Sequence, residues 1–189
     1  MKFRFLIPIA LVTFLSTVVF LYFFHPKNEI SDAELFTQEF TKVDQNNIFR
    51  IADANTVSTL LQDGTGVIFF CHPASDWCQT YATMLNKLAI SHGIDAVYYY
   101  DVVANQEQDN EAYQNLINTL SPHLQYSPIG IKQLYVPDTI FVSSGEIIGN
   151  DWTTSVDTRG INSPEAYWTI ERIKTWEEKT SIYFDELKL

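Results

Sequence analysis

Cysteine is scarce in this sequence: Cys71 and Cys78 are the only two among 189 residues. Two cysteines are too few for the several cross-links of a disulfide scaffold, and too few for a four-cysteine zinc site. Histidine is scarce as well, and His25, His92 and His123 fall near the ends of expected elements instead of forming a cluster. We therefore expect neither a metal nor a cofactor.

Positive charge is also in short supply, with 12 basic against 23 acidic residues and a formal net charge of −11. Lys2 and Arg4 lie in the first 24 residues, which contain no acid, so the remainder is more acidic still. Such a surface repels the phosphate backbone, which excludes a nucleic-acid partner. A solvated, soluble surface is the simplest interpretation.

One long hydrophobic run stands at the amino terminus, where residues 5–24 carry no charge. Twenty helical residues at 1.5 Å each span the hydrocarbon core of a bilayer, about 30 Å thick. A cleaved signal peptide is the alternative, but its apolar region is shorter and ends in small residues. Because this run ends in Leu21, Tyr22, Phe23 and Phe24, we expect a retained transmembrane helix.

The flanking charges predict the orientation of this helix. Lys2 and Arg4 precede it, whereas Glu29, Asp32 and Glu34 soon follow it. By the positive-inside rule the amino terminus lies in the cytoplasm. We therefore expect a single-pass protein of the cell membrane whose domain faces outward, in a compartment that permits disulfides.

The remaining chain predicts one α/β domain. We divide the sequence into an anchor over residues 1–27, a juxtamembrane helical segment over 28–47 and a domain over 48–189. Asp32 is a candidate cap for the helix of the second segment, and the partner of that helix is either the domain or the lipid surface. Expected strands cover 48–52, 66–71 and 96–102, expected helices cover 55–62, 77–91 and 110–124, and an expected hairpin joins 139–142 to 146–148.

The order of these elements indicates the sheet topology. Strand–helix–strand alternation favours parallel pairing, and the later hairpin adds antiparallel strands, so we expect a central mixed sheet flanked by helices. Ser163–Pro164 opens a long terminal helix, which is expected to turn four side chains inward. Those side chains are Tyr167, Ile170, Ile173 and Trp176.

Two local motifs resemble the thioredoxin superfamily. The apolar run 66–70 leads through Cys71 to Ser75–Asp76–Trp77–Cys78, which is similar to the family's strand, active-site loop and helix. The run 136–142 is similar to its cis-proline loop and following strand, with Val136–Pro137 as the candidate cis bond. More narrowly, Trp77–Cys78, the tyrosine-rich strand 98–101 and the segment 145–149 resemble membrane-anchored thioredoxin-like proteins of Gram-positive bacteria, including bacteriocin transport accessory proteins.

The resemblance implies a thioredoxin-like fold over roughly residues 34–185 and a protein or peptide thiol or disulfide as substrate. By resemblance, Cys78 and Cys71 are the catalytic candidates, and the candidate substrate-binding residues are Ser75, Asp76, Trp77, Val136 and Pro137. The motif is degenerate, because Ser75 stands where the family has its nucleophilic cysteine. Serine has a much higher pKa and forms no mixed disulfide.

Three interpretations of the two cysteines remain open at this point. In the first, Cys71 replaces the missing partner of Cys78, and the protein is a dithiol oxidoreductase, provided that the two Cα atoms lie within about 7 Å. In the second, the chemistry is lost and the fold is a binding module for a peptide or protein docked beside Val136–Pro137, with Cys71 as a core residue or in a structural bridge. The third, a metal site on Cys71, His72, Asp76 and Cys78, is the least favoured, because its spacing matches no standard ligand pattern.

Overall fold

The computed structural model describes residues 30–156 and 158–188 of the chain. Residues 31–189 form one compact unit, and the expected transmembrane helix over residues 5–24 lies outside the described residues. None of the helices in the described part combines the length and the apolar character needed to cross a membrane.

A five-stranded mixed sheet forms the centre of this unit, in the order β1-β3-β2-β6-β7. β1 (Phe49–Ile51) and β2 (Gly66–Cys71) both pair in parallel with β3 (Val97–Asp101). β6 (Asp138–Ser143) is antiparallel to β2, and β7 (Glu146–Asp151) is antiparallel to β6. The expected mixed sheet is thereby confirmed, and the architecture is compatible with a thioredoxin-like fold.

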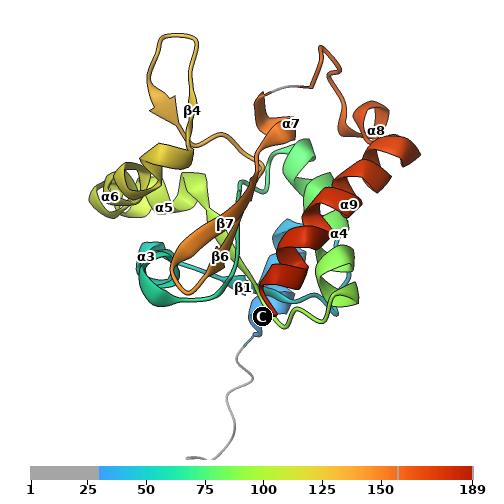
Figure 1. Cartoon of the computed structure of the whole chain (residues 1–189), viewed down its shortest axis with the longest axis horizontal. Coiled ribbons are helices and arrows are strands. Elements are labelled where there is room, and N and C mark those ends of the chain that lie inside the picture. Colours follow the sequence, from blue (N-terminus) through green and yellow to red (C-terminus); the bar gives the residue numbers. More distant parts are fainter. Residues whose placement is uncertain (1–29, 157, 189) are drawn as a thin grey trace, which may run out of the picture. The chain divides into compact units, whose positions relative to one another are not determined.

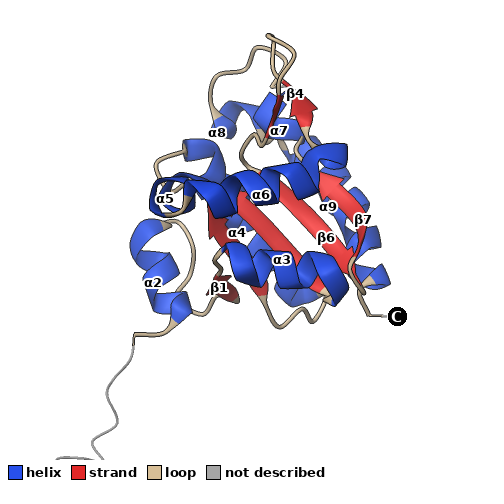
Figure 2. Cartoon of the chain, turned by 90° about the vertical axis from the view of Figure 1, so that its left-hand side faces the viewer, coloured by secondary structure: helices blue, strands red, loops and turns tan. Residues whose placement is uncertain are grey.

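Helices cover both faces of the sheet (Figures 1 and 2). α3 (Ala54–Asp63) and α6 (Asn110–Leu120) lie on one face, while α4 (Asp76–Ser91) and α9 (Ile170–Glu186) lie on the other. β2 is buried on both sides, because alternate residues of a strand point to opposite faces. Val67, Phe69 and Cys71 join the core beneath α4 and α9, whereas Ile68 and Phe70 join the core beneath α3 and α6.

α2 (Asp32–Glu39) packs on the domain and completes the core. Its cap is Ser31, not Asp32: the Ser31 hydroxyl accepts from the Glu34 amide at 3.2 Å, and the Glu34 carboxylate accepts from the Ser31 amide. This reciprocal capping box moves the helix start by one residue. The Phe36 ring is fully buried and stacks on Phe49 with 3.9 Å between centroids.

Several elements were not expected from the sequence. α5 (Val102–Gln108) follows β3 directly, and the expected helix 110–124 ends at Leu120 and passes into η1 (Ser121–His123). A small hairpin of β4 (Gln125–Tyr126) and β5 (Lys132–Gln133) comes next, and α7 (Thr153–Val156) follows β7. The hairpin projects away from the sheet (Figure 1).

The expected terminal helix is interrupted. α8 (Pro164–Tyr167) ends after one turn, and α9 begins afresh with Thr169 as its cap, whose hydroxyl accepts from the Arg172 amide. The break rotates the helix, so that the expected inward position of Ile170 is wrong: this side chain is 89% exposed. Tyr167 and Trp176 are buried as expected.

The topology gathers four chain segments at one edge of the sheet. β2 and β3 are parallel and end there, at Cys71 and Asp101. β6 runs the opposite way, so it starts at that edge, just after Pro137, and β7 ends there at Asp151. The candidate site residues therefore share one edge.

Gly145 provides a test of the β6–β7 turn. Its φ is +80°, and an added Cβ would collide with the backbone of Gln62, 2.7 Å from the carbonyl carbon. Gly130 has a similar φ of +78° with nothing within 4 Å, so it serves as the matched control. We expect Gly130→Ala to lower the free energy of unfolding by about 1 kcal/mol, the cost of a left-handed alanine. Gly145→Ala should cost roughly 3 kcal/mol or more, because the collision adds to that strain. Urea unfolding measures both, and equal losses would contradict this account of the turn.

Candidate functional site

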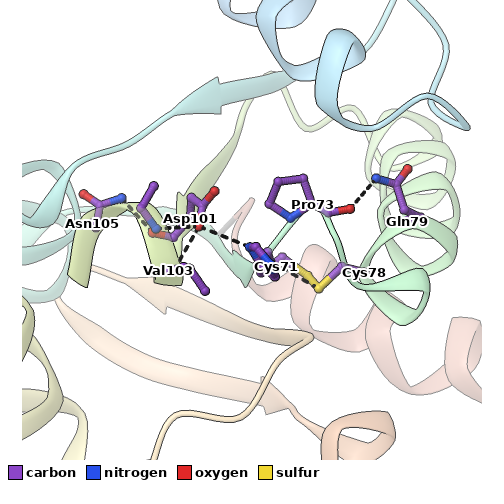
Figure 3. Close-up of polar contacts among 9 residues, drawn as sticks. Cys71, Pro73, Cys78, Gln79, Asp101, Val103 and Asn105 are labelled. Carbon is purple, nitrogen blue, oxygen red and sulfur yellow. Dashed lines mark hydrogen bonds and ion pairs between the residues drawn. A yellow bond between two sulfur atoms is a disulfide. The ribbon is translucent and has the colours of Figure 1, made fainter. Parts of the chain in front are cut away.

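A disulfide joins Cys71 to Cys78 across the corner between β2 and α4 (Figure 3). The two Cα atoms are 5.8 Å apart and the residues are seven positions apart in sequence. Cys71 is the last residue of β2, and Cys78 lies in the first turn of α4. The condition set by the first interpretation, a Cα separation under about 7 Å, is therefore met.

Both cysteines of this disulfide are sealed from solvent. Cys71 and Cys78 each have an exposed fraction of 0% and belong to the core beneath α4 and α9. The sulfur of Cys78 also accepts a hydrogen bond from the backbone amide of His72 at 3.3 Å. In this state an attacking thiolate has no open approach to either sulfur.

Ser75 acts as the amino-terminal cap of α4. Its hydroxyl accepts from the backbone amide of Cys78 at 3.3 Å, satisfying a donor that has no partner within the helix. Asp76 is exposed in the first turn, where a negative charge suits the helix dipole. The ring of Trp77 packs edge-on against Tyr167 with 5.5 Å between centroids. These contacts give Ser75 and Trp77 a structural role.

The peptide bond between Val136 and Pro137 is cis, as expected from the motif. The register of β2 and β6 pairs Phe70 with Asp138, so continuing it by one residue places Pro137 opposite Cys71. Val136 is half-buried and packs against both core clusters. The structure therefore brings the cis-proline loop and the disulfide corner to neighbouring positions, as the sequence motifs predicted.

The loop between the cysteines is held by side chains from outside it. The side-chain nitrogen Nε2 of Gln79 donates to the backbone carbonyls of Pro73 and Glu39, at 2.8 and 2.7 Å respectively. Nδ1 of His72 lies 3.8 Å from Oδ1 of Asp101, at the ends of the two parallel strands. The Asp101 carboxylate in turn caps α5 by accepting from the amides of Val103 and Ala104.

Asp138 is a buried carboxyl group that sequence reasoning missed as a site residue. It follows the cis-proline, has an exposed fraction of 3% and accepts from the side-chain amide of Asn150 at 2.9 Å. Burial, together with the nearby charge of Asp151, raises its pKa to about 8. The pairing of β6 between β2 and β7 buries it.

Asp151 is the second buried carboxylate and is much better satisfied. Its Oδ2 accepts from the Tyr81 hydroxyl and from the Trp176 indole, both at 2.7 Å. Its Oδ1 accepts from the Thr153 hydroxyl and lies 3.6 Å from the ammonium of Lys179. This network fastens α4 and α9 to the end of β7. Nothing in the local sequence pattern marks it, because Tyr81 and Trp176 are 70 and 25 residues away from Asp151.

The disulfide also bears on the metal interpretation. A thiolate binds metal, whereas a sulfur engaged in a disulfide carries no such charge. With Cys71 and Cys78 joined, His72 and Asp76 are the only residues of the proposed set that retain ligand character. The four-ligand arrangement considered from the sequence does not fit this state of the protein.

Comparisons with known proteins return no match, either to a protein-family model or to a curated protein.

Asp138 generates a prediction about pH. A folded-state pKa of about 8, above the ordinary value near 4, means that the folded protein binds this proton more tightly than the unfolded chain does. The resulting stability is complete below about pH 4 and is lost as the pH rises through about 8. Asp138→Asn removes this titration, so its free energy of unfolding relative to the wild type should rise between pH 5 and pH 8.5 by roughly 1 kcal/mol or more.

Urea unfolding at the two pH values measures this difference. Glu146→Gln, at an exposed carboxylate of β7, is the matched control and should show no such change. A constant difference between wild type and Asp138→Asn across the range would contradict the raised pKa.

Proposed function

We propose that this protein is a membrane-anchored, extracytoplasmic thioredoxin-like module that binds a protein or peptide partner at the edge formed by Val136–Pro137. In this proposal the Cys71–Cys78 disulfide is a structural cross-link. The observation that carries it is the complete burial of both cysteines, together with a serine at the position of the family's nucleophile.

The burial argument rests on how disulfides exchange. An incoming thiolate must reach a sulfur in line with the bond, and a leaving thiolate must be stabilised. Here both cysteines lie in an apolar core, which disfavours a thiolate. The backbone amide of Cys78 already donates to the Ser75 hydroxyl, so this donor is not available to stabilise a thiolate. A cross-link placed in this way supports the shape of the edge instead of reacting there.

The docking residues are the ones that share this edge. The Val136–Pro137 loop lies next to the disulfide corner, and Trp77 is half-buried at the start of α4, beside Asp76 and Ser75. Trp77 provides apolar surface for a partner while its ring is held by Tyr167.

The anchor proposal rests on the uncharged run over residues 5–24 and on the basic residues before it.

A thiol–disulfide oxidoreductase using Cys78 with Cys71 is the second candidate, favoured by the fact that the two cysteines are joined at all. An external dithiol would reduce the pair, and a Cys78 thiolate would then attack a substrate disulfide and release one substrate thiol. Attack by Cys71 on that mixed disulfide would release the second thiol and restore the Cys71–Cys78 bond.

Thiol labelling separates the two candidates. We expect the full-length protein in detergent micelles to keep its disulfide during brief dithiothreitol treatment, so that maleimide adds no mass. The same treatment in guanidinium should label both cysteines, which provides the positive control. Labelling of both under native conditions, with exchange onto a model disulfide substrate, would contradict a purely structural cross-link and support the oxidoreductase.

Photo-cross-linking tests the docking edge. A benzophenone amino acid at Val136 should give a discrete higher-mass adduct in native membranes, because a partner seated on the loop lies within reach of the probe. The control position is Ile182 on α9, which is 58% exposed and remote in sequence from the loop. The same adducts from both positions, or none from Val136, would contradict docking at this edge.

A further inference from the structure

The small hairpin of β4 and β5 carries a concentrated patch of exposed apolar surface. Tyr126, Ile129 and Ile131 are 68%, 80% and 61% exposed. We call residues 126–131, which contain all three side chains, the hairpin tip. Figure 1 shows the hairpin standing clear of the sheet and of the helices that cover it. Large apolar side chains that stay exposed together at one projecting point are typical of an interaction site.

The hairpin tip has a fixed backbone conformation. The Ser127 amide donates to the Ile131 carbonyl at 2.8 Å, and the Gly130 amide donates to the Ser127 carbonyl at 2.9 Å. The Ser127 hydroxyl accepts from the Ile131 amide at 3.2 Å. Because these bonds already order the turn, a partner that binds the tip pays little additional conformational entropy.

The charge around the hairpin differs from that of the rest of the domain. Residues 112–137 contain no aspartate or glutamate, although the chain as a whole has 23 acidic residues. Lys132, the lysine of the hairpin, is engaged within the domain: its Nζ donates to the Ser121 carbonyl and lies 5.4 Å from the centroid of the Tyr126 ring. The hairpin therefore has no carboxylate to repel an acidic protein, and its lysine already has partners.

An apolar pocket of about 580 Å³ lies between the hairpin and α6. Tyr113 and Ile117 line it from α6, Leu134 lines it from the segment after β5, and Ile129 and Ile131 line it from the tip. None of its lining residues is acidic. A projecting apolar tip beside an apolar pocket suits a two-fold interface, because each copy contributes the same surface to such an interface.

The proposed anchor turns the hairpin tip away from the lipid. The uncharged run ends at residue 24 and α2 begins at Asp32, so the seven residues between them reach at most about 25 Å. Both views place α2 toward the end of the compact unit opposite the hairpin (Figures 1 and 2). The tips of neighbouring anchored copies therefore lie at a similar height above one membrane, where confinement raises their effective concentration.

We infer that the hairpin tip of one copy packs against the tip and the α6 pocket of a second copy, which forms a two-fold symmetric dimer. Two strongly acidic domains repel each other over most of their surfaces, and the acid-free region 112–137 is where charge opposes their contact least. The inference rests on the proposed function for the anchor, which holds the copies in one membrane and turns their tips outward.

Sedimentation equilibrium of the full-length protein in density-matched, uncharged detergent micelles measures the dimer. Ile129→Gln with Ile131→Gln should raise the dissociation constant at least tenfold, because it removes apolar contacts at positions too exposed to affect folding. The control, Ile170→Gln with Ile182→Gln, changes isoleucines of α9 that are 89% and 58% exposed, and should alter it less than twofold. A protein that stays monomeric at about 0.1 mM, or equal effects of both double variants, would overturn the inference.

The salt dependence separates an apolar contact between like-charged copies from an attraction between opposite charges. Raising sodium chloride from about 50 mM to about 300 mM should lower the dissociation constant at least twofold, because screening weakens the repulsion between two acidic domains. A dissociation constant that rises with salt would mean that opposite charges hold the dimer, and would overturn the apolar contact.

Photo-cross-linking in native membranes identifies what occupies the tip. A benzophenone amino acid at Ile129 should give an adduct of twice the chain mass. An adduct of any other mass, or attachment to lipid alone, would overturn a second copy as the occupant. If the Ile129 adduct forms while the probe at Val136 gives none, the dimer stands and docking at the loop fails. The reverse result overturns the dimer and leaves the docking proposal standing.

Discussion

The covalent bond between the end of β2 and the first turn of α4 fixes the geometry on which the rest of this edge depends. By closing a short loop it restricts the unfolded chain, a contribution of about 2.5 kcal/mol in the chain-entropy model. In the folded protein it holds the helix start where Ser75 can cap it and where the His72 amide meets the Cys78 sulfur. Ser75 caps the helix at this corner with its hydroxyl group and offers no sulfur for exchange. The corner is therefore rigid.

Two buried carboxylates flank this corner on opposite faces of the sheet, and their surroundings differ sharply. Asp151 receives hydrogen bonds from Tyr81, Trp176 and Thr153 and has a lysine nearby, so its charge is compensated. Asp138 accepts from the side-chain amide of Asn150, and its pKa is raised to about 8 by burial and by the charge of Asp151. The first carboxylate joins three elements together, whereas the second keeps a titratable group directly behind the cis-proline loop.

The sequence predicted the parts of the fold that depend on local patterns. The run Gly66–Cys71 was recognisable as a central strand, because it is continuously apolar and bounded by turn residues. The cis bond at Val136–Pro137 followed from a motif resemblance. The break between α8 and α9 was missed, because the apolar spacing runs through it and only the Thr169 cap marks the new start. The burial of Asp138 and Asp151 depends on long-range pairing that no local pattern contains.

The stacked rings of α2 have a practical meaning for where the compact unit begins. Phe36 and Phe40 lie parallel to each other, and both meet the edge of Tyr99, while Phe36 also covers Phe49. A shortened chain that begins after Phe40 would present the rings of Phe49 and Tyr99 to water. Such uncovered aromatic surface favours self-association, so the segment that follows residue 30 is part of the globule and not a dispensable stalk.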